Sequence, residues 1–217
     1  MKAQLFAWMA SAWHVLLSNS HWMTWNLLLA FVPLALSVWL FRSRSRLRSW
    51  LWWVGFVIFV VFLPNAPYVL TDIIHLIQDV RANYSVWLIT LALIPQYLLF
   101  IVAGFEAYVL SLINLGDYLK RLGWGKAILW AELILHGLSA IGIYLGRFKR
   151  FNSWDIVTQL DTLTTSVMDD LVGKRPLLVI TVTFVVIAGL YWLLKEVSLA
   201  ILTYKKHSKS DLPRAEI

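Results

Sequence analysis

The chain has 217 residues, of which 60% are hydrophobic and only 14% are charged. A water-soluble domain of this length needs more polar surface, so the composition excludes an ordinary soluble protein. Without cysteine the chain has no disulfide and no thiolate chemistry, and its net charge of +7 is carried by short segments between apolar runs rather than by a nucleic-acid-binding face.

Long apolar runs predict an all-α, polytopic transmembrane helix bundle with about six spans. In lipid each backbone N–H and C=O must be paired within its own helix. About 20 apolar residues, rising about 1.5 Å each, cross the roughly 30 Å hydrocarbon layer. The expected spans, in a single membrane domain of residues 1–217, lie at about residues 3–20, 22–41, 50–63, 86–113, 127–145 and 177–204.

The first of these runs is the ambiguous one. Residues 3–20 could be the apolar part of a signal peptide, an interfacial helix or a sixth span. We favour a span because no small-residue cleavage site follows the run. Further along the chain, Pro95 is expected to kink the long run at residues 86–113.

The basic residues of the loops predict the orientation. Four arginines crowd the loop after the second run: Arg42, Arg44, Arg46 and Arg48. The excess of Lys and Arg in cytoplasmic loops places this loop and the C-terminus in the cytoplasm, and residues 65–85 and 146–176 outside. The N-terminus is cytoplasmic too if residues 3–20 span. Three basic residues of the second external loop disagree with this rule and need a separate reason: Arg147, Lys149 and Arg150.

Both expected external loops contain an amphipathic helix. At about 100° per residue, Asp72, His75 and Asp79 fall on one side of a helix over residues 72–80, and apolar residues fall on the other. A second helix is expected over residues 153–172, where apolar residues recur every three or four positions. We expect both helices to lie on the outer membrane surface with their apolar sides toward lipid.

Three stretches of the sequence carry a family resemblance. The longer two are Pro64–Leu76 and Gly146–Asp155, and the weaker third is Trp25–Ala30 followed by Pro33. They resemble the signature stretches of a bacterial membrane family catalogued as domain of unknown function 1361. This resemblance covers most of the chain and implies a multi-span protein of the bacterial plasma membrane. It implies no activity, substrate, cofactor or catalytic residue.

The two longer stretches supply an extracytoplasmic candidate site, because both follow spans that leave the membrane on the same side. Its candidate ligand-binding residues are Asn65, Tyr68, Asp72, His75, Arg147, Arg150, Asn152 and Asp155. The arginines could bind an anionic lipid headgroup, since guanidinium and phosphate form paired hydrogen bonds. The interpretation we favour is that they pair with Asp72 or Asp155 and hold the surface helices together. Asp72 and His75 alone are too few ligands for a metal, so we expect no metal or cofactor.

A second candidate site lies within the expected spans. Glu132 and His136 are one turn apart and share a helix face, and Glu106 lies at a similar depth on the preceding span. A carboxylate in the membrane interior is costly and by default suggests a functional site. Neutral carboxyls in interhelical hydrogen bonds are an equally good interpretation. Gln96 could belong to either role.

The sequence therefore leaves three functions open. We favour a membrane scaffold that binds lipid or a partner protein without chemistry. A small-solute or proton-coupled transporter would use Glu106, Glu132 and His136, but no inverted repeat is visible. An interfacial enzyme on lipid-linked substrates would use Asp72 and His75, but the sequence has no nucleophile or phosphate-binding motif. The expected partners are the bilayer and anionic headgroups, and not nucleic acid.

Overall fold

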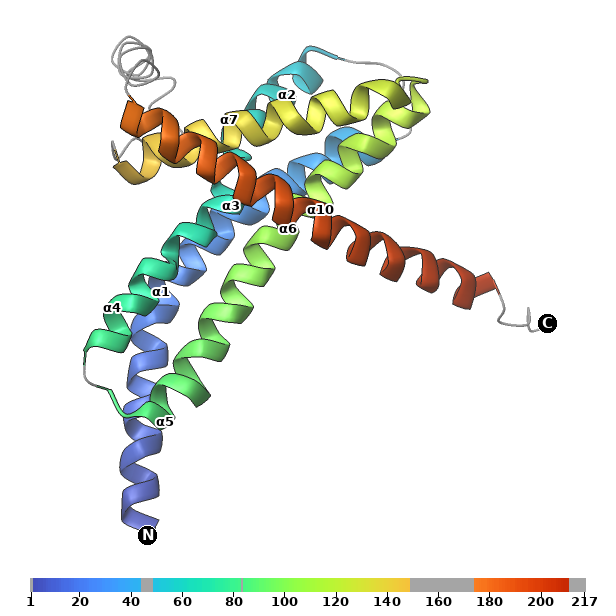
Figure 1. The fold of residues 1–217 in the computed structure, drawn as a ribbon. Helices are drawn as coiled ribbons and strands as arrows, with labels where there is room; N and C mark the ends of the chain where they lie inside the picture. The colour runs from blue at the N-terminus through green and yellow to red at the C-terminus, as the bar shows by residue number, and fades with distance from the viewer. Residues whose placement is uncertain (1, 44–48, 83, 149–173, 211–217) are drawn as a thin grey trace, which may run out of the picture.

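The computed structural model describes residues 2–43, 49–82, 84–148 and 174–210, and these form helices joined by short connections (Figure 1). The helical elements are α1 (Lys2–Arg42), α2 (Trp50–Phe62), α3 (Asn65–Tyr68), η1 (Val69–Asp72), α4 (Ile73–Arg81), α5 (Val86–Leu88), η2 (Ile89–Leu93), α6 (Ile94–Arg121), η3 (Gly125–Ala127), α7 (Ile128–Phe148) and α10 (Lys174–Ser210). The part of the chain that is described contains no strand. The helix expected at residues 153–172 lies outside it.

Five helical stretches are long and apolar enough to cross a membrane: Leu5–Arg42, Trp50–Arg81, Val86–Arg121, Gly125–Phe148 and Arg175–Tyr204. The prediction of an all-α, multi-pass protein is confirmed, but the described residues give five candidate spans where we expected six. The difference arises at the N-terminus, where the runs at residues 3–20 and 22–41 belong to the single helix α1. The polar residues between the two runs are not helix breakers, and Ser20 donates its hydroxyl hydrogen to the Leu16 carbonyl at 2.6 Å within the same helix.

The segment from α2 to α4 is one helical run, Trp50–Arg81, with a turn at Leu63 and Pro64. It continues through α3 and η1 into α4, which lies alongside α1 in Figure 1. The helix expected over residues 72–80 is therefore present as α4. Its apolar residues Ile73, Ile77 and Val80 are exposed, whereas Asp79 bonds to Asn19 of α1. The polar side that we expected to face water instead faces α1, because hydrogen-bond partners lie there.

Glycines allow the segment from α2 to α4 to pack closely against α6 and α7. A Cβ atom added to Gly104 of α6 would lie 2.7 Å from Cγ1 of Val69, and one added to Gly142 of α7 would lie 2.7 Å from Cγ of Pro64. Small residues let helix backbones approach in membranes, where dispersion contacts rather than the hydrophobic effect hold helices together. The stretch Pro64–Leu76 thus begins at a point of close packing against α6 and α7.

Two further helices depart from simple straight spans. The run before Pro95 contains a π-helical turn, η2. Its extra residue accommodates a proline that lacks a backbone N–H and would clash with the preceding turn. In Figure 1, α10 crosses α7 and α6, and its C-terminal half extends away from the other helices. Its outward side chains are apolar and exposed, for example Trp192 and Ile201.

Candidate functional site

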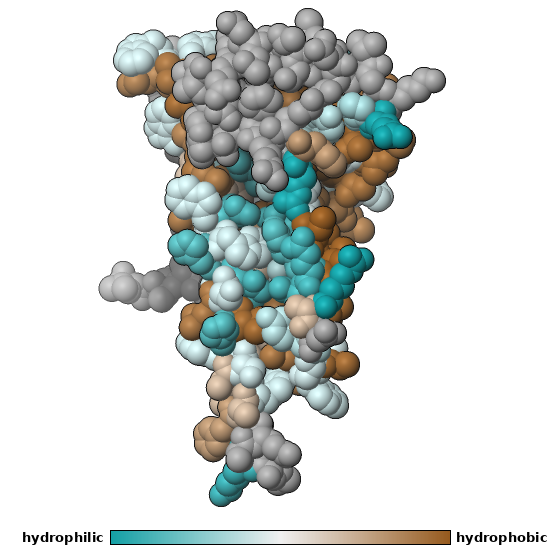
Figure 2. Space-filling model, turned by 90° about the vertical axis from the view of Figure 1, so that its left-hand side faces the viewer, coloured by the Kyte–Doolittle hydropathy of each residue, from teal (hydrophilic) through white to brown (hydrophobic). Residues whose placement is uncertain are grey.

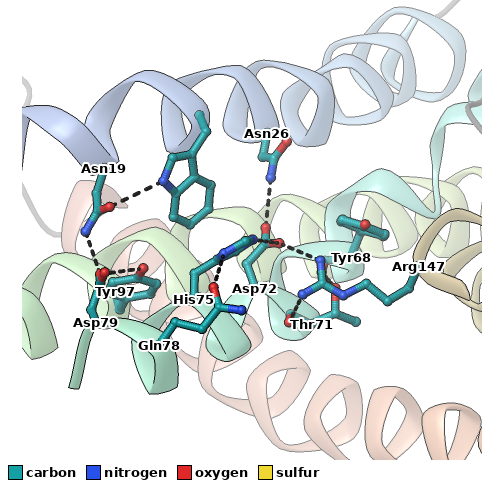
Figure 3. Close-up of polar contacts among 11 residues, drawn as sticks. Asn19, Asn26, Tyr68, Thr71, Asp72, His75, Gln78, Asp79, Tyr97 and Arg147 are labelled. Carbon is teal, nitrogen blue, oxygen red and sulfur yellow. Dashed lines mark hydrogen bonds and ion pairs between the residues drawn. The ribbon is translucent and has the colours of Figure 1, made fainter. Parts of the chain in front are cut away.

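Asp72, at the junction of η1 and α4, is the centre of the first polar cluster. The residue is 1% exposed. Its Oδ2 accepts a hydrogen bond from Nδ2 of Asn26 at 2.8 Å, and its Oδ1 lies 3.5 Å from Nη1 of Arg147. Nε2 of His75 lies 4.0 Å from the same Oδ1. As Figure 3 shows, one carboxylate thereby joins α1, α4 and α7.

Arg147 reaches this cluster from the last turn of α7. Its Nη2 donates to the carbonyl oxygen of Thr71 at 3.2 Å, and its guanidinium lies 6.0 Å from the centroid of the Tyr68 ring. The side chain is 23% exposed. The contact with Asp72 compensates the charge of this arginine inside the protein. Hydrophilic residues gather across the middle of the face drawn in Figure 2, between apolar surfaces.

A second carboxylate extends the cluster along α4. Oδ2 of Asp79 accepts hydrogen bonds from Nδ2 of Asn19 at 2.8 Å and from the Tyr97 hydroxyl at 3.1 Å. Trp22 donates from Nε1 to Oδ1 of Asn19 at 3.4 Å, and its ring lies 4.8 Å from that of His75. Asp79 thus links α4 to both α1 and α6 (Figure 3).

The structure brings together four of the candidate external residues: Tyr68, Asp72, His75 and Arg147. Asn65 lies at the start of α3, where its Nδ2 donates to the Phe62 carbonyl at 2.9 Å and so satisfies a carbonyl at the end of α2. Three candidates lie outside the described residues: Arg150, Asn152 and Asp155. Our sequence reasoning missed Asn19, although an amide within a long apolar run was the available signal.

Three of the intramembrane candidates lie at the contact of α6, α7 and α10, whereas Gln96 of α6 donates to the Leu16 carbonyl of α1. Oε1 of Glu132 accepts hydrogen bonds from Nζ of Lys195 at 2.6 Å and from the Tyr191 hydroxyl at 2.7 Å. Oε1 of Glu106 accepts one from the Ser198 hydroxyl at 2.5 Å. Glu106 and Glu132, which lie at a similar depth, are thus each bonded to a residue of α10.

His136 occupies the same buried side of α7 as Glu132. Its Nδ1 lies 2.7 Å from the hydroxyl oxygen of Tyr108 on α6, and its ring centroid lies 4.7 Å from that of Tyr191. Sequence reasoning did not identify Lys195, yet a lysine inside an apolar run is a recognised sign of an intramembrane partner. Among the described residues, no group of three or more His, Cys, Asp or Glu could hold a metal ion.

The fold and these clusters define a class: an integral membrane protein of several helical spans, in which several buried ionisable groups are paired across helices. Residues 25–188 match the family described as "Protein of unknown function (DUF1361)". Because the match covers most of the chain, the protein belongs to this family. The chain matches no curated protein and no solved structure.

Proposed function

We propose that this protein is a scaffold of the bacterial plasma membrane that binds lipid or a partner protein and performs no chemistry of its own. The arrangement around Asp72 supports this proposal. Both carboxylate oxygens have partners on other helices, and the residue is 1% exposed. Two of the motif residues that suggested a site in the sequence, Asp72 and Arg147, are thus engaged in joining α1, α4 and α7.

This pairing argues against acid–base catalysis by Asp72 and against anion binding by Arg147. A general acid or base must come within hydrogen-bond reach of its substrate, and the carboxylate of Asp72 is enclosed by Asn26 and Arg147. An anion-binding arginine needs a charge that is not already compensated. The guanidinium of Arg147 already meets the Asp72 carboxylate and the Thr71 carbonyl.

The proposal includes an orientation in the membrane. The arginine-rich loop after α1 and the C-terminal tail lie in the cytoplasm, as the positive-inside rule requires. Five crossings, the number of candidate spans among the described residues, then put the N-terminus on the extracytoplasmic side. Our expectation of a cytoplasmic N-terminus depended on residues 3–20 being a separate sixth span.

A proton-coupled transporter is the second candidate, and the contact of Glu132 with Lys195 favours it. Ionisable residues within membrane spans often belong to proton or substrate pathways. Here the carboxylate also bonds to Tyr191, whose ring contacts that of His136. Every one of these groups has a partner on a neighbouring helix, however, which is equally typical of interhelical hydrogen bonding.

One experiment separates the two candidates. The wild-type protein, Glu132→Gln and a control, Glu196→Gln, are reconstituted into liposomes, and the decay of an imposed pH gradient is followed with a trapped fluorescent dye. Glu196 is a suitable control because it is an exposed carboxylate on the same helix as Lys195. The scaffold proposal expects decay at the rate of protein-free liposomes in all three samples. Faster decay that Glu132→Gln abolishes and Glu196→Gln preserves would establish transport instead.

The same variants, purified in detergent, report on binding. Native mass spectrometry of the detergent-purified protein should find lipid or a partner protein retained at a defined stoichiometry. Retention should be equal in Glu132→Gln and wild type, because Glu132 is buried at 8% exposure in the contact with α10. The scaffold proposal would be contradicted if the protein retained neither lipid nor a partner protein and the pH gradient decayed at the rate of protein-free liposomes.

A further inference from the structure

Glu196 of α10 is an acidic residue within a candidate span that has no partner on another of the described helices. The other acidic residues of the candidate spans each contact a hydrogen-bond donor or a cation: Asp72, Asp79, Glu106, Asp117 and Glu132. Glu196 is exposed and forms no hydrogen bond or ion pair with another described residue. Ionisable residues within membrane spans almost always pair with another group, so this carboxylate requires a partner that the described residues do not supply.

The contact of the preceding residue places Glu196 at depth in the membrane. Lys195 donates to Glu132 at 2.6 Å, so this part of α10 lies level with Glu132 on α7. Glu132 is about 9 Å along its span from Lys126, at about 1.5 Å per residue, and basic residues at the ends of spans lie near the membrane surface. Beyond Glu196 the candidate span continues to Tyr204, about 12 Å further. Glu196 therefore lies within the apolar layer rather than among the headgroups.

Glu196 lies on the side of α10 that is turned away from the other helices. At about 100° per residue, it is roughly 140° around the helix from Tyr191, which contacts α7. Trp192 and Leu193, one turn before Glu196, are 69% and 55% exposed, and a Cβ atom added to Gly189 would meet nothing within 4 Å. The span of α10 is the least buried of the five candidates, and its C-terminal half extends away from the other helices in Figure 1. This side of α10 therefore has room for another helix.

A second copy of this chain does not supply the missing cation. Among the described residues, the basic side chains of the candidate spans lie in the first or last turns, apart from Lys195, which is already bonded to Glu132. Copies in one membrane share one orientation, so two α10 helices would bring like carboxylates to the same depth and repel each other. Lipid does not supply the cation either, because acyl chains carry no charge and headgroups lie outside the hydrocarbon layer.

We propose that this side of α10 binds a transmembrane helix of a different protein that carries an arginine or lysine within its span. The carboxylate of Glu196 accepts hydrogen bonds from that cation, and Trp192 and Leu193 pack against the partner helix. Pairing satisfies both charges at a depth where each alone is costly, and the missing side chain of Gly189 lets the two backbones approach. This inference rests on the proposed scaffold role and narrows it to a class of partner.

The test measures the affinity of the full-length protein for designed transmembrane peptides in phosphatidylcholine liposomes. The peptides share a span of about 20 leucines and differ only at the central residue, which is Arg, Gln or Glu. Binding is read as Förster transfer to the peptide from a donor on Ser49→Cys, an exposed position of this cysteine-free chain. The protein with Glu196 should bind the Arg peptide about tenfold more tightly than the Gln peptide, which is about 1.4 kcal/mol, because hydrogen bonds between charged groups are the strong ones. It should bind the Glu peptide least.

Two variants locate the preference. Glu196→Gln removes the charge and keeps the size of the side chain, so the Arg and Gln peptides should bind equally to within about twofold. This variant should keep its fold, since Glu196 has no polar contact with another described residue, and circular dichroism checks that it does. Asp117→Asn is the matched control: it removes one negative charge from an exposed carboxylate that pairs with Lys120 on α6, and the preference should persist. The pH-gradient assay contains no partner helix, so Glu196→Gln remains a suitable control there.

The outcomes are distinguishable. Equal binding of the Arg and Gln peptides by the protein with Glu196, or an unchanged preference in Glu196→Gln, would overturn the pairing site. A preference that Asp117→Asn also abolishes would come from the overall charge of the protein and would overturn the site as well. Binding of none of the peptides would mean that lipid alone covers this side of α10, and would overturn the partner class. The scaffold proposal fails separately, if native mass spectrometry finds neither lipid nor a partner protein retained.

Discussion

Removing both charges of the Asp72–Arg147 pair should destabilise the protein by less than the sum of the losses from removing each charge alone. Oδ1 of Asp72 and Nη1 of Arg147 are 3.5 Å apart, with side-chain exposures of 2% and 23%. Arg147→Gln leaves the enclosed carboxylate without its cation. Breaking a buried ion pair from one side costs about 3–5 kcal/mol, and the partial exposure of Arg147 places the expected loss in the free energy of unfolding near the lower end, about 3 kcal/mol.

The complementary variants complete a double-mutant cycle. Asp72→Asn keeps an acceptor for Asn26, which donates at 2.8 Å, and leaves behind an arginine that can reach solvent or headgroups. We therefore expect a smaller loss, about 1–2 kcal/mol. In the double variant neither charge is left unpaired, so its loss should fall below the sum of the single losses by about 1–2 kcal/mol.

Equilibrium unfolding in mixed detergent micelles, followed by far-ultraviolet circular dichroism, measures all four proteins. Asp117→Asn is the control, because Asp117 and Lys120 form an exposed pair at 4.0 Å with side-chain exposures of 60% and 66%. An exposed pair contributes about 0–1 kcal/mol, so the control should differ little from wild type. Strictly additive losses at Asp72 and Arg147 would contradict this prediction, since they would mean that the two charges do not interact.

Two further predictions concern packing and topology. Gly142→Ala should destabilise the protein by about 1–3 kcal/mol, since its Cβ would lie 2.7 Å from Cγ of Pro64. Gly137→Ala on the same helix meets nothing within 4 Å and should stabilise the protein by about 0.5–1 kcal/mol. Thermal unfolding compares the two variants, and equal effects would contradict the close contact at Gly142. In this cysteine-free chain, a membrane-impermeant maleimide applied to intact spheroplasts should label Lys2→Cys and spare Ser49→Cys. Labelling of neither until the cells are lysed would restore the six-span topology.

Local patterns in the sequence are enough to predict that this chain is helical and where most of its helices lie. The runs expected at residues 50–63, 127–145 and 177–204 correspond to α2, α7 and α10, and the amphipathic pattern over residues 72–80 corresponds to α4. These predictions succeed because lipid obliges each span to pair its backbone groups locally. A local sequence pattern is then enough to predict the element.

The number of spans depended on the tertiary structure. The polar residues at the end of the first run resemble a break between two spans when the sequence is considered alone. In the folded chain the Nδ2 of Asn19 donates to Asp79, and the helix continues through this region as α1. Hydropathy measures the cost of placing a residue in lipid, and it contains no information about a partner that another helix will supply.

The same limit applies to both polar clusters. The sequence identified Asp72, Arg147 and Glu132 as unusual, but their partners lie far away along the chain. Lys195 is 63 positions from Glu132, and Arg147 is bonded to a carbonyl 76 positions away, at Thr71. Which acid meets which base depends on the crossing of helices and on the glycine contacts that set their spacing. Only the tertiary structure could determine these pairings, because side-chain packing between distant segments decides them.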